Sequence, residues 1–352
     1  MICFGRVRKH KLLSERVFGI YNIKGIFFVV GLSVVNNVFI CVILWNFVTA
    51  VIAGESQDLL RSIEQNDCHP SIDKLYKIAV SGDVDGQLAF GYAASKNLCE
   101  AVELGGKYSI DWFRSAAQQG NATAQAELAK KLVSTWDATN EEEAFDWYRL
   151  AADQGNANAQ FGLAQIYDRG RTLSRNIPKS DSEAMDLYLK AAAQGHVGSF
   201  FVLSQIYGKG QMVKRDVWKE AYWNKKGAES DDHYAQVRLA NMYKKGEGVA
   251  QSDAKARYWY SQANALGNKY AKTSLARMLR DGEGGPVDKK IAVKLFAEAA
   301  EAEESNAQYE LGRIYLHGLL GVRKDTAIAK IWMMKAAKRL HPLAIEELEG
   351  LE

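Results

Sequence analysis

A pattern of small and aromatic residues recurs along most of this chain and constrains its fold more than any other feature. Each unit begins with a helical segment whose first buried position is Ser or Ala in all but one case. A turn and a second helical segment follow. The first buried positions lie 35 to 40 residues apart: Ser71, Ser109, Ala144, Ala184, Glu220, Ala256, Ala292 and Ala329. One such helical hairpin cannot bury its apolar side alone, so the units are expected to stack on one another.

Two further positions repeat in the same register over the last seven units. Three places after the first buried position stands tryptophan or leucine, and the tryptophans are Trp112, Trp147, Trp223, Trp259 and Trp332. The second helix carries leucine four places after its own small residue: Leu128, Leu163, Leu203, Leu239, Leu275, Leu311 and Leu348. This register predicts an all-α fold, a right-handed α-solenoid superhelix of about eight helical hairpins. We interpret the tryptophans as structural repeat positions beside alanines of the facing helix, rather than as a platform for sugars or bases.

The pattern A-x-x-W-Y-x-x-A-A-x-x-G-x-x-x-A-Q-x-x-L-A-x-x-Y-x-x-G resembles the Sel-1-like repeat, a relative of the tetratricopeptide repeat. The resemblance covers residues 71–348, and the segment that starts at Tyr243 carries it well. It implies an adaptor that binds proteins without catalysis, as family members do in envelope assembly, secretion, flagellar motors and host interaction. The segment from Asn306 is also similar to periplasmic scaffolds for exopolysaccharide export, alginate's among them, so polysaccharide-export machinery is an alternative partner.

The N-terminal residues predict a membrane segment ahead of the repeats. Residues 1–25 are basic, and residues 26–53 are apolar and contain no charged side chain. This length suffices to cross a bilayer as a helix, and the basic flank places residues 1–25 in the cytoplasm. Two interpretations remain open: a retained signal-anchor in the inner membrane with periplasmic repeats, or a cleaved signal peptide and a periplasmic or secreted protein. Residues 54–70 are expected to be a short helical linker, and residues 71–352 the solenoid.

Charge and cysteine content narrow the function further. Residues 54–352 hold 39 basic and 41 acidic residues, so the repeats lack the positive surface that nucleic-acid binding requires. Cys68 and Cys99 flank the first hairpin, and in an oxidising compartment a disulfide there would staple the N-terminal end of the solenoid. The alternative is two unrelated buried thiols. No cysteine or histidine spacing indicates a metal site, and we expect no cofactor.

Two Ser-x-x-Lys tetrads raise an enzymatic alternative, a β-lactam-hydrolysing or peptidoglycan-acting repeat protein. Ser71 precedes Lys74, and Ser252 precedes Lys255, at the spacing that penicillin-recognising serine enzymes use. The accompanying motifs of those enzymes are absent from the sequence. Both serines stand at hairpin entries, where serine is expected as a helix cap. The sequence therefore predicts a chain without enzymatic activity.

The turn and connector residues predict where helices begin and end. Asp216, Asp253, Asp288 and Asp325 stand just ahead of first helices and are expected to be N-caps, whereas glycines such as Gly246 and Gly282 follow second helices and suit C-caps.

Surface positions on the first helices are the remaining candidates for function. Two places after each first buried position the sequence runs from acidic through aromatic to basic and apolar: Asp111, Asp146, Asp186, Tyr222, Tyr258, Lys294 and Ile331. Aromatic and arginine side chains concentrate binding energy in protein interfaces, so we predict that Tyr222, Arg257 and Tyr258 contact a protein partner. The alternative for each is an ordinary solvated helix surface. The predicted function is an exported or membrane-anchored scaffold for protein–protein interaction in the cell envelope of a Gram-negative bacterium.

Overall fold

The computed structural model describes most of the chain in two compact units. The units are Met1–Ala124 and Gln125–Glu352. The described residues are 16–23, 26–33, 54–65, 69–101, 108–134, 138–172 and 176–350.

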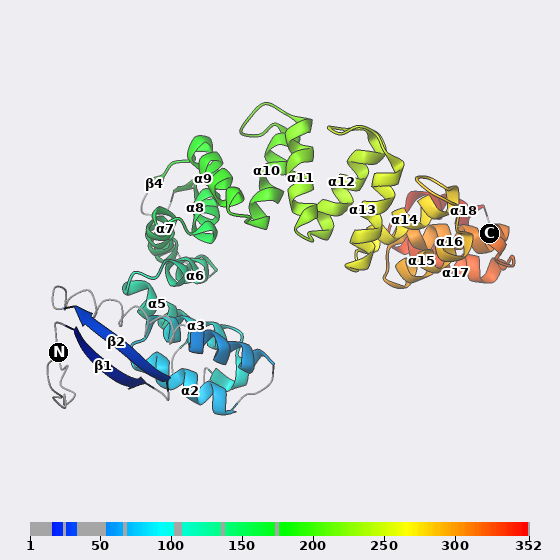
Figure 1. Ribbon diagram of the computed structural model, residues 1–352. Coiled ribbons are helices and arrows are strands. Elements are labelled where there is room, and N and C mark those ends of the chain that lie inside the picture. Colours follow the sequence, from blue (N-terminus) through cyan, green and yellow to red (C-terminus); the bar gives the residue numbers. More distant parts are fainter. Residues whose placement is uncertain are drawn as a thin grey trace. The chain divides into compact units, whose positions relative to one another are not determined.

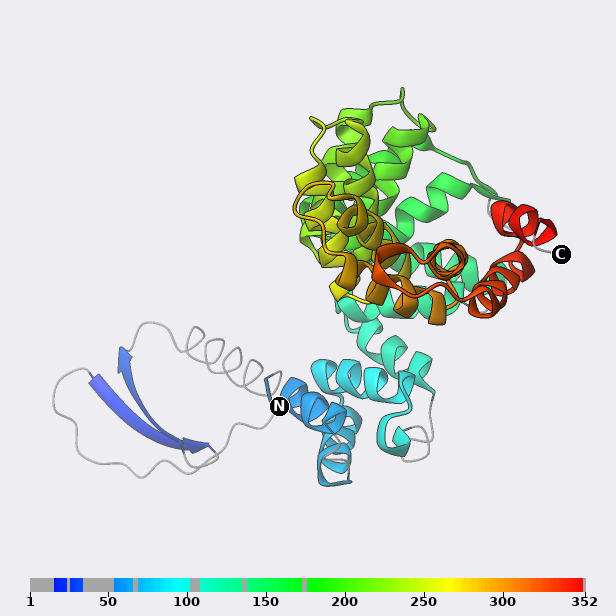
Figure 2. The ribbon, with the colours of Figure 1, turned by 90° about the vertical axis from the view of Figure 1, so that its right-hand side faces the viewer.

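The described part of the N-terminal region is a two-stranded antiparallel ribbon (Figure 2). Strands β1 (Arg16–Ile23) and β2 (Ile26–Ser33) pair along their whole length. The start of the predicted membrane segment is thus extended strand and not helix, whereas residues 34–53 lie outside the described residues. No helix among the residues that the structure describes is long and apolar enough to cross a membrane. The signal-anchor or signal peptide stays a prediction.

The first unit contains a small helical core. Residues 54–64 are helical, and α2 (His69–Val80), α3 (Val84–Ser95), η1 (Leu98–Glu100) and α5 (Ser109–Gln118) follow. Ile63, Leu75, Phe90 and Trp112 are buried together. The rings of Phe90 and Trp112 lie 5.1 Å apart between centroids in an edge arrangement. Residues 54–64, predicted as part of a linker, therefore contribute a packed helix to this core.

The second unit is a stack of helical hairpins in which, from α7 onward, each helix contacts the next in chain order (Figure 1). After α6 (Ala122–Val133), which crosses the boundary between the units, the helices are α7 (Ala138–Asp153), α8 (Ala157–Arg169), α9 (Asp181–Ala193), α10 (Val197–Lys209), α11 (Val217–Glu229), α12 (His233–Lys245), α13 (Asp253–Ala265), α14 (Lys269–Asp281), α15 (Lys289–Glu301), α16 (Ser305–His317), η2 (Leu319–Gly321), α17 (Thr326–Lys338) and α18 (Pro342–Glu349). Strands β3 (Arg171–Thr172) and β4 (Asn176–Ile177) pair in the longest connector. The predicted helical repeat fold is confirmed for this unit.

Side-chain caps fix where the helices begin. Asp216, Asp288 and Asp325 cap α11, α15 and α17, as the sequence predicts. The prediction for Asp253 is wrong by one residue, because Ser252 is the N-cap of α13 and its hydroxyl accepts a hydrogen bond from the backbone N–H of Lys255. Each second helix from α8 onward also has a side-chain cap: Asn156, His196, Asp232, Asn268, Glu304 and His341.

Two glycines let the connectors pass close to the preceding first helix. Gly248 has φ +67°, and a Cβ there would overlap the carbonyl oxygen of Val217 at the start of α11. Gly284 has φ +71° and stands in the same relation to Asp253 at the start of α13. Only glycine suits this combination of left-handed backbone and close approach. Gly248 and Gly284 therefore serve the packing of the connectors against the first helices.

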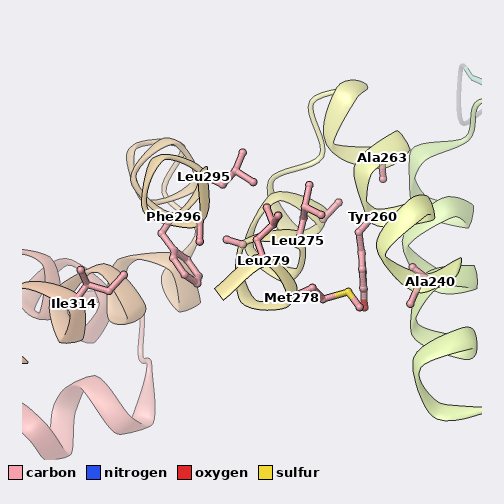
Figure 3. Close-up of a cluster of buried hydrophobic side chains, with 13 residues drawn as sticks. Ala240, Tyr260, Ala263, Leu275, Met278, Leu279, Leu295, Phe296 and Ile314 are labelled. Carbon is pink, nitrogen blue, oxygen red and sulfur yellow. The ribbon is translucent and has the colours of Figure 1, made fainter. Parts of the chain in front are cut away.

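The core of the second unit combines small alanines with large apolar side chains, of which α14 and α15 each contribute more than one (Figure 3). Ala256 and Ala292 are fully buried, so neighbouring helices approach closely. Tyr260 from α13 lies beside Met278 from α14, and Phe296 from α15 packs in the same cluster. The Tyr260 hydroxyl donates to Asn241 Oδ1 at 2.6 Å, which satisfies the polar end of an otherwise buried ring.

Candidate protein-binding surface

The tryptophans of the second unit lie at the edge of the hairpin packing and not at its centre. Trp147, Trp223, Trp259 and Trp332 are half-buried. At the following position of each first helix the side chain is buried: Tyr148, Tyr188, Asn224, Tyr260, Phe296 and Met333. The position after the tryptophan or leucine is thus the more buried of the two on most first helices, and these four tryptophans keep part of their surface accessible.

Two successive first helices present the same aromatic pair. Tyr222 on α11 is 53% exposed and stands edge-on to Trp223, with ring centroids 4.9 Å apart and planes at 79°. Tyr258 on α13 is 54% exposed and meets Trp259 at 5.0 Å and 74°. Edge-to-face contact is a favoured geometry for aromatic pairs. The tryptophans therefore hold both tyrosines in a defined orientation while leaving half of each tyrosine accessible.

Arg257, the third predicted contact residue, is engaged within the fold. Its Nη1 donates to the carbonyl oxygen of Pro286 at 3.0 Å, and the guanidinium lies against Gly285. The side chain is half-buried. Arg257 therefore holds the connector between α14 and α15. Its contact with a partner stays a prediction, and unlike the two tyrosines Arg257 already has a hydrogen-bond partner within the fold.

Three further exposed apolar residues join the tyrosines on first helices: Ile331, a surface position already named from the sequence, and Trp218 and Met334, which the sequence did not predict. Trp218 lies one helical turn before Tyr222 on α11 and is 69% exposed. On α17, Ile331 and Met334 are also exposed. The i to i+4 spacing of Trp218 and Tyr222 was available in the sequence, because residues four apart share a helix face. We call Trp218, Tyr222, Tyr258, Ile331 and Met334 the first-helix surface.

Charges on the same helices change along the stack. At the position of Tyr222, α9 carries Asp186, which pairs with Lys190 at 2.7 Å, and α15 carries Lys294, which lies 3.8 Å from Glu298. Both pairs are solvent-exposed and contribute little to stability. They leave the aromatic positions on α11 and α13 flanked by an acidic position on one side and a basic position on the other.

The Ser-x-x-Lys tetrads serve packing and capping. Ser71 is buried and its hydroxyl donates to Ser62 Oγ at 3.4 Å, whereas Lys74 pairs with Glu55 at 2.8 Å. In the second tetrad, Ser252 caps α13 and the ammonium of Lys255 lies 5.2 Å from the centre of the Tyr243 ring.

Cys99 is disulfide-bonded. Its predicted partner, Cys68, lies outside the described residues, so the pairing of these two cysteines stays a prediction. In the part of the chain that the structure covers, no group of three or more His, Cys, Asp or Glu side chains is placed to hold a metal ion.

Comparisons with protein families and with solved structures agree on one family for this chain. A model of the Sel1 repeat matches residues 106–121, 122–156, 157–196, 201–224, 233–268, 269–303 and 305–339. A protective antigen present in uropathogenic Escherichia coli strains, whose crystal structure displays an SLR fold, is similar at 27% identity and a TM-score of 0.64, over 80% of this chain and 67% of that chain. A Sel1 repeat protein from Oxalobacter formigenes is similar at 26% identity and a TM-score of 0.54, over 66% of this chain and 93% of that chain. No curated protein matches the sequence. The repeat register, the stacked hairpins and these matches show that the chain belongs to the Sel1 repeat family.

Proposed function

We propose that this protein is a scaffold whose first-helix surface binds a protein partner. The observation that carries the proposal is the pair of matching Tyr–Trp arrangements on α11 and α13, Tyr222 with Trp223 and Tyr258 with Trp259. Membership of the Sel1 repeat family supports a role in protein–protein interaction.

The physical case rests on preorganisation. Tyrosine and tryptophan offer large contact area at a low cost in conformational entropy, and they dominate the energetic centres of interfaces. Tyr222 is held by Trp223 on one side, and the Lys226 ammonium lies 5.9 Å from its ring centre. Trp218 adds an exposed indole one turn away. A partner that covers this part of α11 therefore buries apolar area at little cost in side-chain entropy, because the Tyr222 ring is already held in place.

The cellular location remains a prediction from sequence. Retention in the inner membrane, or export to the periplasm, rests on residues 26–53, most of which lie outside the described residues. Nothing in the described residues favours the exopolysaccharide-export alternative. The roles of Ser71 and Ser252 in packing and capping argue against the β-lactam alternative.

An affinity pull-down of the tagged full-length chain, read by mass spectrometry, tests the proposal. We expect an enriched partner to be lost from the Tyr222→Ala/Tyr258→Ala double variant. The matched control is Tyr234→Ala/Tyr270→Ala, because these tyrosines are 61% and 53% exposed but lie on second helices. Loss of the partner from both variants, or from neither, would contradict the assignment of the first-helix surface.

A further inference from the structure

Pairs of glutamines, one exposed and one buried, join neighbouring hairpins in the first half of the second unit. The second glutamine of each pair lies just after a first helix, and its Nε2 donates to a glutamine near the start of the preceding second helix. Gln154 donates to Gln125 Oε1 at 2.8 Å, and Gln194 donates to Gln160 Oε1 at 2.8 Å. Both accepting residues are buried. We call each such pair a glutamine clasp.

The last junction has the accepting half of a clasp but not the donating half. Gln308 on α16 occupies the position of Gln125 and is 3% exposed. Its Nε2 donates to the carbonyl oxygen of Ala300 at 3.1 Å, and its Oε1 has no hydrogen-bond partner. Arg339 stands where the donating glutamine would be, and it pairs instead with Glu303. A buried acceptor without a donor is costly, so this junction is incomplete as it stands.

A pocket opens at the same junction. It has a volume of about 560 Å³ and is formed by the end of α15, the start of α16 and the second half of α17, with Gln308 and Trp332 in its lining. The volume lies within the range of small-ligand pockets. Lys335 lies 4.0 Å from the centre of the Trp332 ring, and Lys338 also lines the pocket. No described residue forms an ion pair with Lys338.

The combination of charge and missing donor distinguishes this junction from the one between α12 and α13. Gln236 also has an Oε1 without a partner, but Leu266 stands in the place of Arg339 there. A leucine brings neither a charge nor a hydrogen-bond donor. At the last junction the pocket lining holds the Trp332 indole and three cations, Lys335, Lys338 and Arg339, against two carboxylates, Glu301 and Glu303. An anionic ligand therefore meets a net positive charge beside the site of the missing amide.

We propose that the pocket formed by Gln308, Trp332, Lys335 and Lys338 binds a peptide segment that carries a carboxylate. The carboxylate pairs with the ammonium groups of Lys338 and Lys335, which are charge-assisted contacts. A peptide N–H supplies the donor that Gln308 Oε1 lacks, in the place where Gln154 and Gln194 bring an amide at the other junctions. The apolar part of the segment packs on Trp332. The carboxylate belongs either to the C-terminus of the peptide or to an Asp or Glu side chain.

The inference is independent of the first-helix surface, because it uses none of the tyrosines on α11 and α13. Its test is therefore separate. Three pools of fluorescent hexapeptides with random uncharged residues are titrated into the purified full-length chain: one with a free C-terminal carboxylate, one amidated, and one amidated with a single internal Glu. We expect the first or third pool to bind and the amidated, uncharged pool not to bind. The pool that binds identifies the source of the carboxylate.

Three variants sharpen the result. Lys338→Ala should weaken binding about tenfold or more, because one charge-assisted contact is lost. Arg339→Gln should complete a glutamine clasp with Gln308, reduce binding and leave the melting temperature equal or higher. Lys290→Ala, an exposed lysine on α15 outside the pocket, should change nothing. Equal binding of all three pools, no binding up to millimolar peptide, or unchanged binding by Lys338→Ala would overturn the proposal.

Discussion

Neighbouring hairpins of the second unit are joined by neutral hydrogen bonds in one region and by charged hydrogen bonds in another. Comparing the two regions shows which contacts the repeat requires and which can vary. Between α6 and α9 the polar contacts that link hairpins include neutral glutamine clasps, Gln154 with Gln125 and Gln194 with Gln160. Between α14 and α18 they are charged. Glu310 on α16 accepts from Arg277 Nε at 3.0 Å and from Arg280 Nη1 at 2.9 Å.

The packing beneath these contacts is the same in both regions. The first helices α9 and α15 each bury an alanine, Ala184 and Ala292, and a large ring four residues later, Tyr188 and Phe296. Apolar packing at these positions is therefore what defines the hairpin stack. The polar residues between hairpins are exchangeable as long as each buried donor and acceptor is satisfied.

The largest expected effect tests whether the two regions share one core. Tyr188→Ala and Phe296→Ala should each lower the free energy of unfolding by about 3–5 kcal/mol, because each leaves a large cavity in a packed interface. Denaturant unfolding and amide hydrogen exchange measure the loss globally and locally. Tyr188→Phe is the control for the hydroxyl group. A loss below about 1 kcal/mol for either alanine variant would show that the two regions are not equivalent.

A smaller difference is expected between the charged and the neutral junctions. Glu310→Ala leaves two arginines without their shared acceptor and should cost about 2–3 kcal/mol, whereas Gln160→Ala removes one neutral hydrogen bond and should cost about 1 kcal/mol. Asp186→Ala, which breaks an exposed pair with Lys190, is the control and should cost under about 0.5 kcal/mol. Equal costs for Glu310→Ala and Gln160→Ala in unfolding experiments would remove the distinction between the charged and the neutral junctions.

The smallest effect concerns pH and the caps of the second helices. The backbone N–H of Ser199 donates to His196 Nδ1 at 3.1 Å, so the imidazole caps α10 in its neutral form. Burial against Phe161, whose ring centre lies 4.4 Å away, lowers the pKa of His196 below its ordinary value of 6.5. Because the folded state disfavours the proton, the stability of this cap is present above pH 6.5 and is lost as the pH falls below that value.

His196→Asn should remove that pH dependence, since asparagine caps α8 and α14 in the same position without titrating. Melting temperatures of the variant and the wild type at pH 7.5 and pH 5 provide the measurement. The wild type should lose about 1 kcal/mol more than the variant on acidification, the usual worth of an N-cap. Identical acid sensitivity would assign the pH dependence to other groups.

The sequence predicted the features that depend on local spacing and missed those that depend on stacking. The register of alanines and leucines predicted the hairpins, and Asp216 and Asp325 were predicted as caps because capping acts over three residues. The glutamine clasps join residues that are 29 and 34 positions apart, so their pairing follows only from the stacking of hairpins.

The sequence also did not predict which of two adjacent aromatic side chains is buried. Trp259 and Tyr260 are neighbours, and which ring is buried depends on the rotation of α13 against α14. The structure buries Tyr260 and leaves Trp259 at the edge. Arg257 was predicted as a contact residue, yet it bonds to Pro286 because the connector folds back over α13. The contact of Tyr222 and Tyr258 with a protein partner is a prediction that binding data test.

Site-specific photo-crosslinking of the full-length chain in cells is the most direct test of that claim. A photoreactive phenylalanine is placed in turn at positions 222, 258, 234 and 270, all of which carry exposed tyrosines. We expect a crosslink to one protein partner from positions 222 and 258, which lie on first helices, and none from positions 234 and 270, which lie on second helices. Crosslinks of equal yield from all four positions, or only from 234 and 270, would contradict it.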